Sequence, residues 1–327
     1  MLFRLFLSGV GGFTMKLSVI LPCYNGAETI AVQLEALTNQ QWSDDWDVVV
    51  VNNGSTDNSM EIVERYRDRL PNLRIVNAYT PPSPRRGVAH SYRVGIREST
   101  GDAFVFCEAD DEVAPGWLAA MGEALKEHDF VAGALEYGRL NEPWLVGDSD
   151  LIDTQFHNYW VMPDLPYASG CKVGMRRSLY ESIGEFDEAC KTSWDVDYCW
   201  RVQLAGYQLH FVSNAIVHYR LTHNLKDRFR KGRIWAQTGA ILLKKYREPK
   251  GVLRKLKYFV LAFLDSLLQL LKFPVECYSR KARAEWVWEM GWYIGVWEGA
   301  LQYLLLNEPL QAQTSSATTV EVGHKTV

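Results

Sequence analysis

Short apolar runs alternate with helix-like stretches over the first two thirds of the chain. The apolar runs predict buried strands, and the stretches between them predict helices. Strands that alternate with helices at short spacing are typical of a mostly parallel sheet covered on both faces. We therefore expect an α/β fold with a mixed, mostly parallel sheet flanked by helices. The predicted strands are residues 16–22, 46–51, 73–77, 103–107, 130–136, 208–212 and 215–218, and the predicted helices are 28–39, one that begins at Asn58, 87–98, 117–126 and 195–205.

The C-terminal third changes character at a cluster of basic residues within 244–257. Apolar residues then recur at helical spacing over 253–271, and a second stretch, 286–303, is rich in tryptophan. The apolar run of the first stretch is far shorter than the ~20 residues that a membrane span needs. Basic residues beside amphipathic, tryptophan-rich helices are typical of an interfacial membrane anchor. We expect residues 250–306 to contact a membrane surface; the alternative is that these helices pack on the domain or on a partner subunit.

These patterns divide the chain into four parts. Met15 stands directly before the first predicted strand, so residues 1–15 are expected to be disordered or a start-site extension. Residues 16–240 are expected to form the α/β domain, and 241–306 the basic, amphipathic helical region. The polar, Thr/Ser-rich segment 307–327 is expected to be a disordered tail.

Composition narrows the classes of function and the location. A formal net charge of -4 argues against a nucleic-acid partner. The six cysteines are scattered, with no CxxC pair and no Cys/His cluster of zinc spacing. Buried, reduced thiols indicate a cytoplasmic protein, which the C-terminal helices would hold at the inner face of the cell membrane.

Three carboxylates follow the predicted strand 103–107, in the sequence Glu108-Ala109-Asp110-Asp111. Ligands of open α/β sheets bind at the ends of strands. Like charges this close repel one another unless a positive charge lies between them, and Mg²⁺ binds through one or two carboxylates together with substrate phosphates. The stretch therefore predicts a site for a divalent metal, Mg²⁺ or Mn²⁺, and a diphosphate; the alternative is a solvated acidic turn.

A series of motifs follows in order along the chain: Ser18-Val19-Ile20-Leu21-Pro22-Cys23-Tyr24-Asn25, Val49-Val50-Val51-Asn52-Asn53-Gly54-Ser55-Thr56-Asp57, Gly87-Val88-Ala89, Glu108-Ala109-Asp110-Asp111, Gly184-Glu185-Phe186-Asp187-Glu188, Trp194-Asp195-Val196-Asp197-Tyr198-Cys199-Trp200-Arg201, Ala205-Gly206-Tyr207 and Val217-His218-Tyr219-Arg220. Taken together and in this order, the motifs resemble those of the family 2 glycosyltransferases, which have the GT-A fold, a Rossmann-like α/β architecture. The resemblance covers residues 16–240. It implies inverting transfer of a sugar from a nucleotide-diphospho-sugar to a hydroxyl acceptor, a lipid-linked or cell-surface glycan.

For the donor, the resemblance implies contacts from the ends of the first two strands, from arginines and from the acidic turn. The family often has an aspartate where this chain has Asn52 or Asn53, and an amide can both donate and accept hydrogen bonds. Uracil, thymine and guanine therefore all stay open as the base, and a plain turn with a helix cap is the alternative for this loop. The residues expected to contact the nucleotide-sugar are Pro22, Tyr24, Asn25, Asn52, Asn53, Gly54, Asp57, Arg86, Arg93, Glu108, Ala109 and Asp110.

The resemblance also assigns the metal and the chemistry. Asp110 is the expected metal ligand, with Glu108 near the ribose or a metal-bound water, and His218 matches a position that often supplies a further ligand. Asp195 is the expected general base, which takes the proton from the acceptor hydroxyl. Its place at a helix N-terminus is expected to lower its pKa, whereas the nearby Asp197 would raise it. The residues expected on the acceptor side are Gly170, Trp194 and Asp197.

Departures from the family pattern leave a second function open. They occur at Glu108, Asn52, Tyr92 and Trp194, and motivate the alternative of a catalytically weak or inactive nucleotide-sugar or glycan-binding protein on the same fold. A nucleotidyltransferase is disfavoured because the segment 22–26 is not a glycine-rich, lysine-bearing loop, and a dehydrogenase because GxGxxG is absent there. The sugar, the base, the acceptor and the oligomeric state are left open.

Overall fold

The computed structural model describes residues 14–146, 151–272 and 278–307. The segments 1–15 and 307–327, for which the sequence predicts disorder, lie outside these described residues, except for Thr14, Met15 and Asn307. Met15 is buried, its amide donates to Asp44, and its carbonyl accepts a hydrogen bond from the Trp42 indole. The folded part of the described chain therefore includes Met15.

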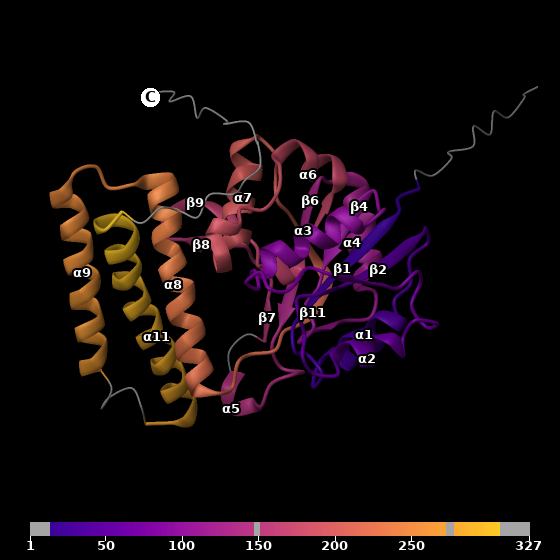
Figure 1. Ribbon diagram of the computed structural model, residues 1–327, viewed down its shortest axis with the longest axis horizontal. Coiled ribbons are helices and arrows are strands. Elements are labelled where there is room, and N and C mark those ends of the chain that lie inside the picture. The colour runs from indigo at the N-terminus through magenta and orange to yellow at the C-terminus, as the bar shows by residue number, and fades with distance from the viewer. Residues whose placement is uncertain (1–13, 147–150, 273–277, 308–327) are drawn as a thin grey trace, which may run out of the picture.

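A mixed β-sheet forms the centre of the molecule (Figure 1). Its strand order is β3-β2-β1-β4-β10-β6-β11-β5, with β7 paired to β6. Strands β3, β2, β1, β4, β6 and β11 run in one direction, whereas β10, β5 and β7 run in the other. The predicted mixed, mostly parallel sheet is therefore confirmed. The strands are β1 (Leu17–Cys23), β2 (Trp46–Asn52), β3 (Arg74–Asn77), β4 (Ala103–Phe106), β5 (Glu112–Val113), β6 (Phe130–Glu136), β7 (Ile152–Asp153), β10 (Val173–Arg176) and β11 (His210–His218).

Helices cover both faces of this sheet, because neighbouring strand residues point to opposite sides. On one side Val19 and Val48 pack with α1 (Ile30–Thr38), α2 (Ser59–Glu64) and α4 (Trp117–Glu127). On the other side Ile20 and Val49 pack with α3 (Val88–Glu98), α6 (Arg177–Ile183) and α7 (Trp194–Leu204). Both layers consist of valine, isoleucine, leucine and aromatic side chains, which explains why the strands of the first half read as continuous apolar runs.

Two segments differ from the predicted elements. The two short strands expected over 208–218 form one strand, β11, whose register against β6 shifts between Val212 and Ile216. The aromatic segment before β10 contains a short helix, α5 (Pro143–Val146), and a two-stranded sheet of β8 (His157–Tyr159) and β9 (Met162–Tyr167).

The C-terminal helices form a layer beside the sheet (Figure 1). They are α8 (Leu225–Arg247), α9 (Val252–Leu271) and α11 (Arg280–Gly299), which continues as a π-helical turn, η3 (Ala300–Leu305). The predicted pair of amphipathic helices corresponds to α9 and α11, whereas α8 was not expected and runs without a break through residue 240, where the sequence suggested a boundary. Within the described ranges, no helix combines the length and the apolar character that crossing a membrane requires.

Candidate active site

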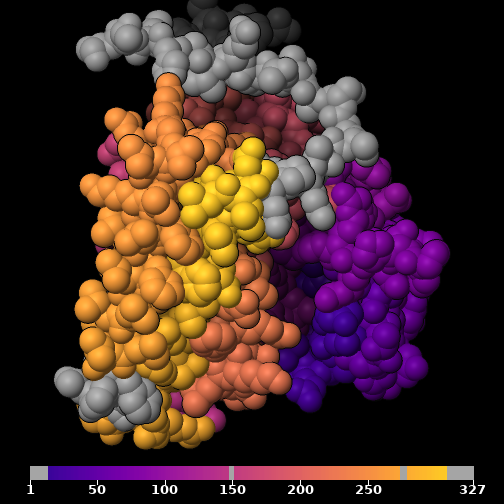
Figure 2. Space-filling model, turned by 60° about the vertical axis from the view of Figure 1, so that its left-hand side comes forward, coloured from indigo at the N-terminus to yellow at the C-terminus, as the bar shows by residue number. Residues whose placement is uncertain are grey.

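A cavity of about 1020 Å³ lies between the ends of the sheet strands and the C-terminal helices. Figure 2 shows the corresponding hollow between the N-terminal half and the helices of the C-terminal third. The loops after β1, β2 and β4 form one wall, and α8 and α11 form the opposite wall. This is the edge of the sheet at which open α/β folds bind ligands.

Most of the residues singled out from the sequence meet in this cavity, and the others lie outside it. Those in its lining are Pro22, Tyr24, Asn25, Asn53, Arg86, Glu108, Ala109, Asp110, Gly170, Trp194 and Asp195. Those outside the lining are Asn52, Gly54, Asp57, Arg93, Asp197 and His218.

The loops after β1 and β2 are held together by hydrogen bonds between them. Asn25, which has a positive φ of 48°, accepts a hydrogen bond from the Thr56 amide at 2.8 Å. The Asp57 carboxylate accepts one from the Ala27 amide at 3.1 Å. Gly54 also has a positive φ, of 81°, and a Cβ there would collide with the Tyr79 ring. Asp57 and Gly54 therefore shape the cavity wall without lining it.

Asn53 lines the cavity and is largely buried. The relative solvent exposure of Asn53 is 5%. Its side-chain amide group donates to the Arg86 carbonyl at 2.8 Å, whereas Oδ1 has no hydrogen-bond partner among the described residues. The Asn52 side chain instead donates to Asn77 and accepts from the Ser55 amide. Of the two amides that the sequence left as alternatives, Asn53 is the one that lines the cavity, and its buried Oδ1 has no partner among the described residues.

Of the arginines near the expected diphosphate site, Arg85 and Arg86 line the cavity, whereas Arg93 does not. Arg85 lies over the Tyr24 ring, with its guanidinium carbon 3.4 Å from the ring centroid, and both residues line the cavity. Arg86 also lines it and pairs with Glu188. Arg93 is buried and pairs with Glu185 and Glu188 outside the lining. The structure therefore does not bring Arg93 to the cavity; its two carboxylate partners join α3 to the segment before α7.

The acidic turn forms a compact group of carboxylates. One oxygen each of Glu108, Asp110 and Asp111 lies within 4.8 Å of the others. The Arg220 amide donates to Asp111 Oδ1 at 2.9 Å, whereas the buried Oδ2 has no partner among the described residues. Burial, with the Asp110 charge, raises the pKa of Glu108 to about 7 and also raises that of Asp111. Unpaired carboxylate oxygens turned toward one point fit a hard divalent cation, which takes oxygen ligands.

His218 is not part of this group. Its Nδ1 lies 2.6 Å from Glu136 Oε2, and it stands outside the cavity lining. The expected role as a second metal ligand beside Asp110 therefore has no support in the geometry. A histidine that the sequence analysis missed, His223, does line the cavity. It follows β11 in an irregular segment without a pattern of its own, so no sequence signal marked it.

Asp195 lies in the first turn of α7, at the cavity. Its Oδ2 accepts a hydrogen bond from the Gly170 amide at 3.0 Å, and Oδ1 accepts one from Val196 at 2.9 Å. Burial nevertheless raises the pKa of Asp195 to about 6. The lowering expected from the helix N-terminus is thus outweighed by desolvation, which disfavours the charged form. A carboxylate with this pKa is suited to accept a proton near neutral pH.

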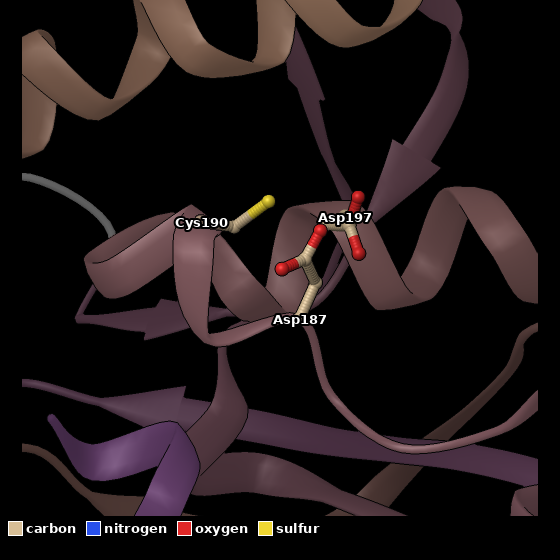
Figure 3. A group of neighbouring side chains, drawn as sticks. All are labelled: Asp187, Cys190 and Asp197. Atoms are coloured by element: carbon tan, nitrogen blue, oxygen red, sulfur yellow. The ribbon is translucent and has the colours of Figure 1, made fainter. Parts of the chain in front are cut away.

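Asp197 points away from the cavity, toward α8. Figure 3 shows its carboxylate beside the carboxylate of Asp187 and the thiol of Cys190. Lys245 Nζ lies 2.7 Å from Asp197 and 2.8 Å from Asp187, and the Tyr246 hydroxyl donates to Asp197 at 2.8 Å. Burial alone would raise the pKa of Asp197, but the charges of Arg201 and Lys245 outweigh it and lower the pKa. The expected acceptor-side role is therefore replaced by a structural one, since Asp197 ties α7 to α8.

The opposite wall contains residues that the sequence analysis did not connect with the site. Lys231 and Trp235 come from α8, and Trp288 and Trp292 come from α11. The Lys231 charge lowers the pKa of Glu108, against the larger effect of burial, so this ammonium group faces the acidic turn. Trp235 was not singled out from the sequence, whereas Trp288 and Trp292 lie in the stretch expected to contact a membrane or, as the alternative, to pack on the domain or on a partner subunit. Their spacing of one helical turn was the available signal, because it places both on one face of a helix.

Comparison with known sequences gives a consistent family. The family model described as Glycosyl transferase family 2 matches residues 18–184, about half of the chain. The uncharacterized glycosyltransferase YibD of Escherichia coli is 32% identical over 131 residues, which are 40% of this chain and 35% of YibD. The poly(ribitol-phosphate) beta-N-acetylglucosaminyltransferase TarS of Staphylococcus aureus is 33% identical over 119 residues, 35% of this chain and 19% of TarS. The chain thus spans about a third or less of these two relatives.

Comparison with solved structures concerns the fold. The mannosyltransferase PcManGT from Pyrobaculum calidifontis, solved in complex with GDP-Man and Mn²⁺, superimposes with a TM-score of 0.57. The two sequences are 19% identical, and the match covers 91% of this chain and 89% of PcManGT. The likeness extends over the sheet and its covering helices, and it confirms the predicted GT-A fold.

Proposed function

Because this chain belongs to glycosyl transferase family 2, we propose that it transfers a sugar from a nucleotide-diphospho-sugar to a hydroxyl group of an acceptor. One observation carries the proposal: the acidic turn and Asp195 share one cavity. Burial is the main reason for the raised pKa of Glu108, and the Asp195 charge contributes to it, so the two carboxylates are close. A carboxylate group that fits a metal and a separate carboxylate that fits a base are the two parts that such a transfer needs.

The donor would lie along the N-terminal wall. Asn53 Oδ1 is suited to accept a hydrogen bond from a base N–H, which uracil, thymine and guanine each offer. Arg85 and Arg86 line the neighbouring part of the cavity and would bind the diphosphate through guanidinium hydrogen bonds. Asp110, with Glu108 and Asp111, would hold Mg²⁺ or Mn²⁺. When bound there, the cation would stabilise negative charge on the leaving diphosphate.

Asp195 would act on the acceptor. Its carboxylate would take the proton from the acceptor hydroxyl as that oxygen attacks the anomeric carbon, in a single in-line displacement that inverts the configuration. The backbone amides of Gly170 and Val196 hold both of its oxygens in place. Trp194 lines the cavity directly before it, and the side chain fills the space above Gly170. A polymeric acceptor is consistent with the Staphylococcus aureus relative, whose name gives poly(ribitol-phosphate) as its substrate.

Hydrolysis of nucleotide-sugars with Mn²⁺ tests this function directly. The wild type should hydrolyse at least one of UDP-glucose, UDP-N-acetylglucosamine and GDP-mannose, because water replaces a missing acceptor. Asp195→Asn should reduce the rate by about 100-fold or more, the usual range for removal of a general base. Thermal shift with the matching nucleotide diphosphate should be unchanged in this variant. A wild type that binds nucleotide but hydrolyses none of the donors would instead favour a binding protein on the same fold.

We also propose that α9 rests on an anionic membrane surface. Figure 1 shows α9 on the side of the helical layer that is remote from the sheet. Its inner side packs on α11, where Phe263 stacks edge-on against Trp297. Its outer side is apolar and exposed: Leu253 is 82% and Leu271 74% accessible. The other exposed apolar residues of α9 are Val252, Leu256, Val260, Leu261, Phe263 (which also contacts Trp297), Leu264, Leu267, Leu268 and Leu270.

Positive charges beside this face favour an anionic membrane as its binding partner. Lys250, Arg254 and Lys257 are exposed at the N-terminal end of α9. Apolar side chains next to a cationic patch fit the interface of an anionic bilayer. The protein would then face acceptors that are attached to lipid or assembled near the membrane.

Vesicle flotation tests the membrane contact. The protein should float with vesicles of phosphatidylglycerol and phosphatidylcholine, and less with phosphatidylcholine alone. Leu264→Glu with Leu268→Glu should abolish flotation, whereas Leu204→Glu, at an exposed leucine of α7, should not. Failure to float, together with a dimer in light scattering that Leu264→Glu dissociates, would assign the face to a second copy of the chain.

A further inference from the structure

An aromatic wall lies on the C-terminal helices, on the same side of the cavity as Asp195. It consists of Trp235 of α8 and of Trp288 and Trp292 of α11, all half-buried and all in the cavity lining. The Trp235 and Trp288 rings meet edge to face, with centroids 5.4 Å apart. Among the described residues, none accepts a hydrogen bond from the indole N–H of these three tryptophans. The wall thus offers apolar ring surface together with unused donors.

Close packing of α8 against α11 fixes the position of this wall. A Cβ at Gly291 would run into the Phe229 carbonyl oxygen, and one at Gly295 would run into that of Arg233. The Arg233 guanidinium also pairs with Glu298 at 2.6 Å. Backbones that approach this closely leave little freedom for the two helices to slide. Trp288 and Trp292 are therefore held by the helix pair and not by a loop.

The same helix pair is joined to the segment that carries Asp195. Tyr159 bridges the two, because its ring packs against Trp292 of α11 and also, edge to face, against Trp200 of α7. Burial raises the pKa of Tyr159, and the Asp195 charge contributes to the shift, so this ring lies near the carboxylate. The aromatic wall is thus on the Asp195 side of the cavity, and the nucleotide loops are on the other.

We propose that Trp288 and Trp292, with Trp235, bind a pyranose ring of the acceptor. A pyranose has a flat face of C–H groups that complements the electron-rich face of an indole, and its hydroxyl groups can accept from the free indole N–H groups. A ring seated on this wall presents a hydroxyl toward Asp195. An acyclic polyol phosphate has no such face to stack. The inference rests on the proposed transferase function and names the substrate class on its acceptor side.

The test uses the full chain with UDP or GDP and Mn²⁺, and p-nitrophenyl glycosides of glucose, galactose, N-acetylglucosamine and mannose as probes. Binding is followed by NMR of the indole N–H signals, and the KM of each glycoside for sugar transfer is measured with the nucleotide-sugar that the wild type hydrolyses in place of UDP or GDP. At least one glycoside should shift the Trp288 and Trp292 signals. Trp288→Ala and Trp292→Ala should each weaken its binding by about tenfold, as expected for the loss of an aromatic stack, and Trp288→Phe should restore most of it.

Trp297→Ala is the matched control, because Trp297 lies on the same helix but packs against Phe259 and Phe263. It should lower the melting temperature and leave glycoside binding unchanged. Equal glycoside binding by wild type, Trp288→Ala and Trp292→Ala would overturn the inference. The inference would also be overturned if the wild type bound none of the four glycosides, whether or not it bound ribitol 5-phosphate. Nucleotide binding and donor hydrolysis are measured on the same samples. If the wild type shows neither, the proposed transferase function is refuted. If it shows both but glycoside binding does not depend on the tryptophans, only the role of the aromatic wall is refuted.

Discussion

The hydroxyl groups of Thr238 and Ser193 lie 2.7 Å apart, and they connect the middle of α8 to the residue that precedes α7. Both side chains are buried. Ser193 stands two positions before Asp195, so the C-terminal helical layer is bonded directly to the segment with the proposed base. Lys245 and Tyr246 make a second connection through Asp197. The helices thus support the site in addition to any membrane contact.

Thr238→Val should therefore impair catalysis from outside the cavity. The change keeps the side-chain shape but leaves the Ser193 hydroxyl without this partner, at a cost of about 1–3 kcal/mol in the free energy of unfolding. A small displacement of Asp195 should lower kcat by about tenfold, with the affinity for nucleotide diphosphate unchanged. Ser266→Ala removes a buried hydroxyl of α9 that bonds only within its own helix and serves as the control. An unchanged kcat in Thr238→Val would show that the connection does not position Asp195.

The rate of transfer should depend on the ionisation of Asp195. Burial raises its pKa to about 6, so kcat/KM should rise with pH through about 6 and then level off. The ionisable groups whose pKa the Asp195 charge raises are Glu108, Tyr159, Tyr167, Cys171 and Cys199. Asp195→Glu is expected to move the inflection, whereas Asp187→Asn, outside the cavity, should leave it in place. A rate that is flat between pH 5 and pH 7 would contradict a role as general base.

The same pKa shift has a consequence for stability with a definite sign. The folded state binds the Asp195 proton more tightly than the unfolded chain, whose aspartates titrate near ~4. The contribution of this group to the free energy of unfolding should therefore fall as pH rises from about 4 to about 6, and then stay constant. Chemical denaturation of the wild type and of Asp195→Asn at pH 4.5 and pH 7.5 measures this. The free energy of unfolding of Asp195→Asn, relative to that of the wild type, should be higher at pH 7.5 than at pH 4.5.

Asp110→Asn should separate metal binding from folding. Asp110 raises the pKa of Glu108 through charge repulsion, second only to burial. Without metal, the variant should thus melt at the same temperature as the wild type or a higher one. The added thermal shift from Mn²⁺ with nucleotide diphosphate should be lost, because one of three clustered carboxylates is gone. Glu112→Gln, which pairs with Arg139, is the control. A full Mn²⁺-dependent shift in Asp110→Asn would exclude this carboxylate as a ligand.

Asn53→Leu should weaken nucleotide binding without opening the cavity wall. It removes Oδ1, the acceptor without a partner among the described residues, and also the hydrogen bond to the Arg86 carbonyl. Calorimetry with the preferred nucleotide diphosphate should show a loss of about tenfold, the worth of one hydrogen bond in a buried site. Asn77→Leu alters only the exposed contact with Asn52 and should bind normally. Equal affinity in Asn53→Leu and wild type would place the base elsewhere.

Much of the fold could be predicted because its signals are local. Strands buried on both faces read as apolar runs, and Val48 to Val51 is one example that became β2. The acidic turn was visible for the same reason, since three carboxylates directly after a buried strand stand out from their neighbours. By contrast, α8 was missed as an element, although it supports the site. Its buried residues up to Ala240 are glycine, alanine and threonine, and the large apolar ones, Ile241 to Leu243, are consecutive and so show no helical spacing.

By itself, the sequence determined the alternation of strands and helices up to β4, the acidic turn after β4 and the place of Asp195 in the first turn of a helix, because each depends on residues that are adjacent in the chain. Only the tertiary structure decided which side chains face the cavity. Asp197 meets Lys245 from 48 positions away, and Arg93 meets Glu188 from 95 positions away. It also moved Trp288 and Trp292 from an assigned membrane contact to the cavity wall. Such pairings follow from how helices pack on a sheet, and they leave no periodic trace in the chain.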